Sequence, residues 1–143
     1  MKISSKGRYA LLLLLDLAEQ RQAGYTALKD IAKRQGISKK YLEQILMMLN
    51  KTNLLHTNRG YQGGYKLAVS PDKITVGSIL RLTENNLTVS DTYYQSEECT
   101  NEVFINLFIC KGLKNVIDNY LDNITIQDII DKKNETYADS YII

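Results

Sequence analysis

Residues 28–67 of the chain read LKDIAKRQGISKKYLEQILMMLNKTNLLHTNRGYQGGYKL, and this segment predicts two short helices followed by a β-hairpin. Thr26 is a candidate N-cap for the first helix, and Gly36 lies where a helix ends in a left-handed residue. Ser38 is the N-cap candidate for a second helix over residues 38–50. Two helices of this length joined by a short turn have the dimensions of a helix-turn-helix, whose second helix enters the major groove of DNA.

The second predicted helix is amphipathic. One side carries an apolar stripe that can pack on the rest of the domain, formed by Leu42, Ile45, Leu46 and Leu49. The opposite side carries Lys40, Gln44, Met47 and Lys51, with Tyr41 at the flank. Helical hairpins are common in all-α proteins, so this pattern alone leaves open a hairpin that does not bind DNA.

The segment after the second helix predicts two short strands, Leu54–Asn58 and Tyr65–Leu67. The turn between them contains Gly60, Gly63 and Gly64, and glycine permits the positive φ angles of a tight hairpin. Glycine-rich turns also hold nucleotide phosphates, but the spacing here matches neither common fingerprint and no Gly-Lys-Ser/Thr follows. We therefore interpret the hairpin as the wing of a winged helix-turn-helix.

Segments on both sides complete a predicted DNA-binding domain over residues 1–83. A first helix is expected over residues 5–20, where apolar residues recur at helical spacing. After the wing, Pro71 precedes a short helix that Thr75 can cap. This short helix is expected to close the domain.

The remaining chain has a different organisation. Residues 84–98 are polar without a clear period and predict a connecting loop. Residues 99–143 predict a long dimerisation helix, one more short helix beginning near Thr125, and a tail over residues 136–143. The predicted fold class is mainly α with a small β-hairpin, as a winged helix-turn-helix domain plus a long dimerisation helix.

The long helix carries an apolar seam with a seven-residue repeat. Its members are Val103, Cys110, Leu113, Ile117, Tyr120 and Ile124, with Asn106 as the polar exception. Such a seam is covered either by the first helix of the same chain or by a second copy. A homodimer is the predicted arrangement, because two-fold symmetry is what a palindromic DNA site requires.

Charge is distributed unevenly along the 143 residues. Residues 1–82 carry 14 Lys and Arg against 5 Asp and Glu, a net +9, whereas residues 83–143 carry 4 against 11, a net −7. A basic half favours a polyanion such as double-stranded DNA, because each Lys or Arg placed on a phosphate releases a counterion. A chance dipole is the alternative interpretation.

The composition also argues against several classes of function. The longest apolar run, residues 10–15, is far shorter than the roughly 20 residues needed to cross a bilayer, so a cytoplasmic protein without membrane contact is predicted. Two cysteines and one histidine, His56, supply neither a disulfide scaffold nor a metal site. No nucleophile with a base and no paired carboxylates can be assembled. We therefore expect neither a cofactor nor an enzymatic activity.

Separated motifs give the chain a resemblance to a known family over nearly its whole length. They are MKISxKGRYA at residues 1–10, LKDIA at 28–32, ISxxYLEQIL at 37–46, RGxxGGY at 59–65 and ITIxDI at 124–129. In this order they resemble the bacterial winged helix-turn-helix regulators that include IscR, NsrR and CymR. The resemblance implies a homodimeric repressor, or dual regulator, that binds an imperfect palindrome. The apolar ending at residues 141–143 is similar to tails of the CymR-like branch.

The resemblance places the DNA contacts on the second helix of the motif and on the wing. Serine and tyrosine hydroxyls can reach phosphates or base edges, and Gln44 can pair bidentately with adenine. Arg59 is placed in a minor groove, where narrow A·T-rich sequence concentrates negative potential, and Lys40 is interpreted as a phosphate contact. The predicted DNA-binding residues are Ser38, Lys40, Tyr41, Gln44, Arg59 and Gly60.

Several members of this family hold an iron–sulfur cluster through three cysteines and a fourth ligand, and here the sequence departs from that pattern. In an alignment without gaps, the last cysteine and its nearby histidine fall on Phe104 and Leu107, and neither can bind iron. Cys110 belongs to the seam, where a packing role is predicted, and only Cys99 lies near a ligand position.

Alternatives to the favoured interpretation stay open at this point. Redox sensing by a cluster or by the Cys99 thiol is one, although the acidic neighbours of Cys99 disfavour a reactive thiolate. A winged-helix interaction module without DNA affinity is another. The effector, a small molecule or a partner protein, is not identified by the sequence.

Overall fold

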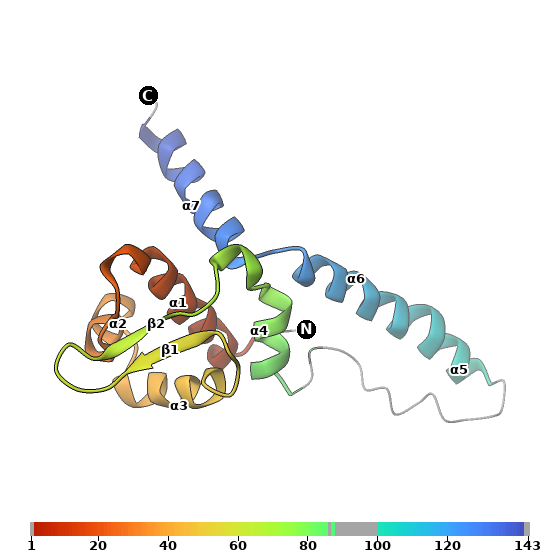
Figure 1. Cartoon of the computed structure of the whole chain (residues 1–143). Helices are drawn as coiled ribbons and strands as arrows, with labels where there is room; N and C mark the ends of the chain where they lie inside the picture. Colours follow the sequence, from red (N-terminus) through yellow and green to blue (C-terminus); the bar gives the residue numbers. More distant parts are fainter. Residues whose placement is uncertain (1, 86, 88–99, 142–143) are drawn as a thin grey trace.

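The computed structural model describes residues 2–85, 87 and 100–141, and most of its regular structure is helical (Figure 1). A two-stranded antiparallel sheet completes the fold, so the predicted mainly α class with a small hairpin is confirmed. The elements are α1 (Ser5–Glu19), η1 (Arg21–Ala23), α2 (Leu28–Gln35), α3 (Lys39–Leu49), β1 (Leu55–Asn58), β2 (Gly64–Leu67), η2 (Pro71–Lys73), α4 (Val76–Thr83), α5 (Asn101–Ile105), η4 (Asn106–Cys110), α6 (Lys111–Asp122) and α7 (Ile126–Tyr141).

Helix α1 forms the centre of the N-terminal domain. Ser4 caps it by accepting a hydrogen bond from the Gly7 backbone N–H at 3.1 Å. Its buried side carries Ala10, Leu13, Leu14 and Leu17, each at most 1% exposed. Helices α2, α3, α4 and α7 and strand β2 all contact this helix, so its apolar side organises the main core.

Helices α2 and α3 form the predicted helix-turn-helix. Gly36 ends α2 with a φ of +63°, in the left-handed region that favours glycine. Ser38 caps α3 by accepting a hydrogen bond from the Tyr41 N–H at 3.2 Å. The apolar stripe of α3 is buried at Leu42, Ile45, Leu46 and Leu49. These local signals therefore define the turn between α2 and α3 and leave the polar side of α3 exposed, as predicted.

Thr26 does not cap α2, and that prediction was wrong. The N-cap is Ala27, which makes no side-chain capping hydrogen bond. Thr26 instead forms an antiparallel bridge with Tyr65 of the wing, in which its N–H donates to the Tyr65 carbonyl at 2.8 Å and its carbonyl accepts from the Tyr65 N–H at 2.9 Å. A Cβ on Gly64 would overlap the Thr26 carbonyl oxygen, so glycine at this position permits the bridge.

A buried carboxylate ties α1 to α2. Asp16 is 3% exposed and accepts two hydrogen bonds from Arg34, at 2.9 Å from Nε and 2.7 Å from Nη2. Gln35 donates a third, from Nε2 at 2.9 Å. A buried charge is tolerated only when it is paired and hydrogen-bonded, so this arrangement satisfies Asp16 and fixes α2 on α1. The Asp16 carboxylate in turn raises the pKa of Arg34.

The long helix follows the N-terminal domain. Thr100 caps it by accepting a hydrogen bond from the Val103 N–H at 3.4 Å, and helical backbone angles at the junctions join α5, η4 and α6 without a break. The segment η4 is a π-helix. The long helix projects away from the domain (Figure 1) and packs on α4 near its C-terminal end. Val76, Leu80 and Leu121 form a second, smaller core there.

Helix α7 is longer than the short helix expected near Thr125, and it continues through most of the predicted tail. Thr125 and Asp128 form the expected capping box: the Thr125 N–H donates to Asp128 Oδ2 at 2.8 Å, and the Asp128 N–H donates to Thr125 Oγ1 at 3.1 Å. Ile126 is buried in the main core, whereas residues 131–140 are exposed. Residues 131–140 show no periodic apolar pattern, so the sequence did not predict that the helix continues through them.

Removal of the buried carboxylate is expected to destabilise the domain. Asp16→Ala leaves the donors of Arg34 and Gln35 without their acceptor, and an unmade hydrogen bond of this kind costs about 1 to 3 kcal/mol. Urea unfolding should show the loss. Lys73→Ala, which removes an exposed ion pair at 3.9 Å to Asp72, is the control and should change stability by less than about 0.5 kcal/mol. Equal losses in both variants would contradict this role of Asp16.

Candidate nucleic-acid interface

Helix α3 presents an uncovered polar face opposite its buried stripe. Ser38, Lys40 and Gln44 are all exposed on this helix or at its cap. Side chains four residues apart are neighbours on a helix, so Lys40 and Gln44 lie side by side. The structure thus brings three of the predicted contact residues onto one accessible surface.

Tyr41 differs from these residues because it is half-buried. Its ring packs edge-to-face on Tyr9 of α1, with the ring centroids 5.4 Å apart and the planes at 89°. Aromatic pairs of this geometry contribute about 0.5 to 1.5 kcal/mol beyond their burial. Tyr41 therefore also orients α3 on α1, a role that the sequence analysis missed although the flank position of Tyr41 was recognised.

The tip of the wing carries the other two predicted contact residues. Arg59 and Gly60 are exposed, and the hairpin turn projects beyond the helices of the domain (Figure 1). Gly60 has a φ of +105° and Gln62 a φ of +65°, so the turn needs left-handed backbone at two places. Tyr61 is 98% exposed. The sequence analysis did not select Tyr61 or Gln62, although an aromatic and an amide between turn glycines were the available signal.

The six predicted dimer residues lie in different environments. Leu113 and Tyr120 are exposed, and Val103 and Cys110 are half-buried. Ile117 and Ile124 pack against the small core of the same chain, which includes two residues of α4. The seven-residue seam therefore faces partly toward the protein's own domain.

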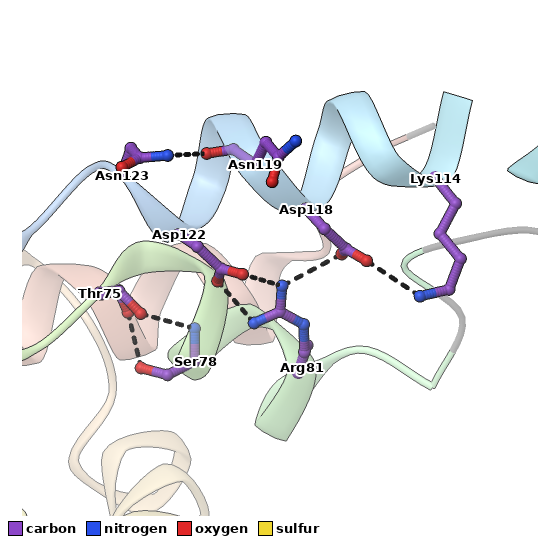
Figure 2. Close-up of polar contacts among 8 residues, drawn as sticks. All are labelled: Thr75, Ser78, Arg81, Lys114, Asp118, Asn119, Asp122 and Asn123. Carbon is purple, nitrogen blue, oxygen red and sulfur yellow. Dashed lines mark hydrogen bonds and ion pairs between the residues drawn. The ribbon is translucent and has the colours of Figure 1, made fainter. Parts of the chain in front are cut away.

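A cluster of charged side chains joins α4 to the long helix (Figure 2). Arg81 donates to both carboxylate oxygens of Asp122, at 2.7 and 2.9 Å, and to Asp118 at 3.1 Å. Lys114 donates to the second oxygen of Asp118 at 2.9 Å. A Cβ on Gly77 would overlap the Asp122 carboxylate, so glycine lets α4 approach this closely. We call this group of four charged residues the α4–α6 clasp.

The clasp shifts the acidities of its members in the directions that ion pairing predicts. Hydrogen bonds from Lys114 and then from Arg81 lower the pKa of Asp118. Asp122 and then Asp118 raise the pKa of Arg81. A forked arginine–carboxylate contact also has a defined geometry, so the clasp restricts rotation of α4 against α6.

A backbone bridge reinforces the clasp next to it. Thr75 and Thr125 form an isolated antiparallel bridge, in which the Val76 N–H donates to the Ile124 carbonyl at 2.8 Å and the Ile126 N–H donates to the Ile74 carbonyl at 2.9 Å. The start of α4 and the corner between α6 and α7 are therefore joined by main-chain hydrogen bonds. The helix-turn-helix domain and the long helix are held together at two adjacent points.

Comparison with known proteins matches this architecture to one family. The Rrf2 family model, described as an iron-dependent transcriptional regulator, matches residues 3–132. The chain belongs to the Rrf2 family. Among curated Rrf2 relatives, the transcriptional regulator CymR of Bacillus subtilis is 35% identical over 129 residues, which cover 90% of this chain and 89% of CymR. The regulator IscR of Pectobacterium carotovorum is 36% identical over 135 residues, which cover 93% of this chain and 81% of that protein.

Solved structures of Rrf2 proteins agree with the fold. IscR of T. potens aligns with a TM-score of 0.73 at 37% identity, covering 95% of this chain and 90% of that one. CymR of B. subtilis, titled the global cysteine regulator, aligns with a TM-score of 0.68 at 36% identity, covering 90% and 95%. The chain is thus a helix-turn-helix transcription regulator rather than an enzyme, as predicted. In the part that the structure describes, no helix is long and apolar enough to cross a membrane.

The family description includes iron, but the donor set of this chain does not fit the three-cysteine pattern. The whole sequence contains two cysteines. Phe104 and Leu107, which the resemblance aligns with ligand positions, carry no donor atoms, and Cys99 lies outside the described residues. Within the described ranges, no three His, Cys, Asp or Glu residues gather where they could hold a metal ion. Cys110 Sγ lies 3.7 Å from Asn106 Oδ1, inside the long helix.

The clasp is expected to make stability depend on pH in the acidic range. Because the folded pKa of Asp118 is lowered, its contribution is complete above the unfolded value of about 4 and is lost as the pH falls through the folded value. Asp118→Asn should therefore show a shallower fall in the free energy of unfolding between about pH 4 and pH 2 than the parent.

Denaturant unfolding across this pH range measures that difference. Asn119→Ala, an exposed change on the same helix that leaves the clasp intact, is the control and should keep the parental slope. If the free energy of unfolding of Asp118→Asn fell with pH as steeply as that of the parent, the ion pairing of Asp118 in the folded protein would be contradicted.

Proposed function

We propose that this Rrf2 protein is a sequence-specific repressor that binds a palindromic operator as a homodimer in the cytoplasm. The observation that carries the proposal is the uncovered polar face of α3, whose opposite side is fully used in the core. A helix held in this way by its apolar side can enter the major groove without rearrangement. The net charge of +9 over residues 1–82 supplies the attraction to phosphates.

The exposed residues divide into reading and positioning contacts. Gln44 has an amide that matches the N6 and N7 edge of adenine, so it is assigned to base readout. Lys40 and the Ser38 hydroxyl, at the N-terminal end of α3, are assigned to phosphates. The Tyr41 hydroxyl can make either kind of contact, to a base edge or to a phosphate. Arg59, supported by the tight turn at Gly60, is assigned to the minor groove beside the α3 contact.

The long helix supplies the homodimer contact in this proposal. It exposes several large apolar side chains in the single chain, and contiguous apolar surface of this kind marks an interaction site. A second copy with two-fold symmetry places two α3 helices on two half-sites of a palindrome. Occupation of an operator that overlaps a promoter then blocks transcription. No cofactor is included, because the donor set does not fit a cluster.

Loss of the Gln44 amide is expected to relax base preference. An operator is first obtained by selecting bound sequences from random duplex DNA. Gln44→Ala should lower discrimination at one position in each half-site by about 1 to 3 kcal/mol, because the bidentate contact to adenine is lost. Binding to all single-base operator variants measures this. Unchanged discrimination at every position would contradict the assignment of Gln44.

Loss of the Arg59 guanidinium is expected to change the preference for the DNA sequence that flanks the operator. Arg59→Ala should weaken binding to operators with A·T-rich flanks more than to operators with G·C-rich flanks, because a narrow minor groove concentrates negative potential. Lys73→Ala, which removes the same charge from the exposed η2 turn, is the control and should not distinguish the flanks. Equal behaviour of the two variants would contradict the minor-groove assignment.

DNA-binding titrations at increasing salt concentration separate this proposal from an interaction module that does not bind DNA. Phosphate contacts predict that the affinity for duplex DNA falls steeply as salt rises. An affinity that is weak and independent of salt would support the interaction module.

A further inference from the structure

The tip of the wing stands clear of the rest of the domain. A cavity of about 510 Å³ lies between the hairpin turn and the start of α2. Its lining comes from both sides and includes Asn58, Tyr61 and Gln62 of the turn and Ala27 and Asp30 of the domain. Residues 58–62 are all exposed. The direction in which the tip presents Arg59 is therefore set by contacts at the base of the hairpin.

Strand β2 carries the attachment at that base. Leu67 is 7% exposed in the main core, and Tyr65 makes the two backbone hydrogen bonds to Thr26. Strand β1 is mostly exposed and is held through its pairing with β2. The direction of the wing therefore follows the direction of β2 at the Thr26–Tyr65 bridge.

A side-chain contact lies directly beside this bridge. Antiparallel pairing of Thr26 with Tyr65 places Tyr25 opposite Lys66, and the side chains of directly opposed residues meet on one face. The Lys66 ammonium lies over the Tyr25 ring, with Nζ 4.6 Å from the ring centroid. This is a cation–π contact, in which the negative face of the ring attracts the cation. We call the contact between Tyr25 and Lys66 the wing anchor.

The wing anchor strengthens an attachment that is otherwise short. The Thr26–Tyr65 bridge is isolated, so backbone pairing between β2 and the segment before α2 is limited to one residue pair. Backbone hydrogen bonds with few neighbours open locally more easily than those in the middle of a packed element. The wing anchor restrains the next residue pair by its side chains. Lys66 is accordingly half-buried, whereas Arg59 at the tip is exposed.

We infer that the wing anchor sets the direction in which Arg59 meets the minor groove, so that Lys66 is a positioning residue and not a phosphate contact. For the part that concerns DNA, the inference rests on the proposed function. Without the anchor, the wing occupies other directions as well, and a contact can shift such a population only by its own free energy. For an exposed cation–π contact this corresponds to a factor of about two to five.

The first measurement uses the protein without DNA. Amide hydrogen exchange of Tyr65, whose N–H donates to the Thr26 carbonyl, reports opening of the bridge. Tyr25→Leu should accelerate this exchange about two- to fivefold, and Tyr25→Phe should keep the parental rate because the ring remains. Tyr137→Leu makes the same change on α7, where Tyr137 is 58% exposed, and is the matched control. Unchanged exchange in Tyr25→Leu overturns the wing anchor, whatever the protein does with DNA.

The second measurement tests the consequence for Arg59. Binding to the selected operator is compared between A·T-rich and G·C-rich flanks. Tyr25→Leu should lower the preference for A·T-rich flanks by about two- to fivefold, whereas Tyr25→Phe and Lys66→Arg should keep it. The base preference assigned to Gln44 should stay parental in all three variants, because α3 is held by its own buried stripe.

Salt dependence separates positioning from a direct phosphate contact. It is measured on the operator with G·C-rich flanks, where Arg59 contributes least. Lys66→Met should show the same salt slope as Lys73→Met, which removes an equal charge from the exposed η2 turn. A phosphate contact of Lys66 would instead lower the slope by about one, and that result overturns the positioning role.

A double variant tests whether Tyr25 and Lys66 act together. Tyr25→Leu combined with Lys66→Met should lose no more flank preference than either single variant, because both changes remove the same contact. Additive losses overturn the wing anchor. Equal losses in Tyr25→Leu and Tyr25→Phe also overturn it, because they assign the effect to the tyrosine hydroxyl.

Failure of the proposed function gives a different result. A parent that does not distinguish the flanks overturns the minor-groove assignment of Arg59, and with it the effect of the anchor on DNA. A parent that prefers A·T-rich flanks, together with an unchanged preference in Tyr25→Leu, overturns only the role of the wing anchor. Circular dichroism checks that every variant keeps the parental helical signal.

Discussion

The leucine-rich face of α1 is buried from several sides at once, and this burial holds the N-terminal domain together. Leu13, Leu14 and Leu17 are almost completely inaccessible, and full burial of each contributes about 2 kcal/mol. Because α3 and β2 both pack on α1, the second helix of the helix-turn-helix and the wing share one support. Apolar burial has no direction of its own, so the hydrogen bonds of Asp16 to Arg34 and Gln35 add the orientation of α2 that packing does not specify.

The junction between α4 and α6 transmits that orientation to the long helix. A forked ion pair and a two-bond backbone bridge lie close together at this junction. Exposed ion pairs contribute little to stability individually, so geometry is the larger effect of the clasp. With the domain fixed on its long helix, the distance between the two α3 helices in the proposed homodimer depends on how the two long helices are placed.

Much of the fold and of the candidate site could be predicted because the signals are local. Gly36 and Ser38 act within one turn of helix, and the amphipathic pattern of α3 places Gln44 outside. The prediction that Thr26 caps α2 was wrong because the partner of Thr26, Tyr65, is distant in sequence. The strand-like contact with Tyr65 outweighs the local capping preference. The aromatic contact of Tyr41 with Tyr9 was missed for the same reason. A seven-residue repeat likewise does not reveal which partner covers it, and Ile117 is covered by its own domain.

Two positions that the resemblance aligns with iron ligands carry apolar side chains on the long helix, Phe104 and Leu107. Phe104 occupies one of these positions, and here its ring is stacked on Phe108. A phenyl ring has no donor atom for iron, and the two stacked rings instead form an exposed aromatic surface, since Phe104 is 49% and Phe108 76% exposed. In the proposed homodimer, this aromatic surface is available for contact between the subunits at a position where the three-cysteine pattern would require a ligand.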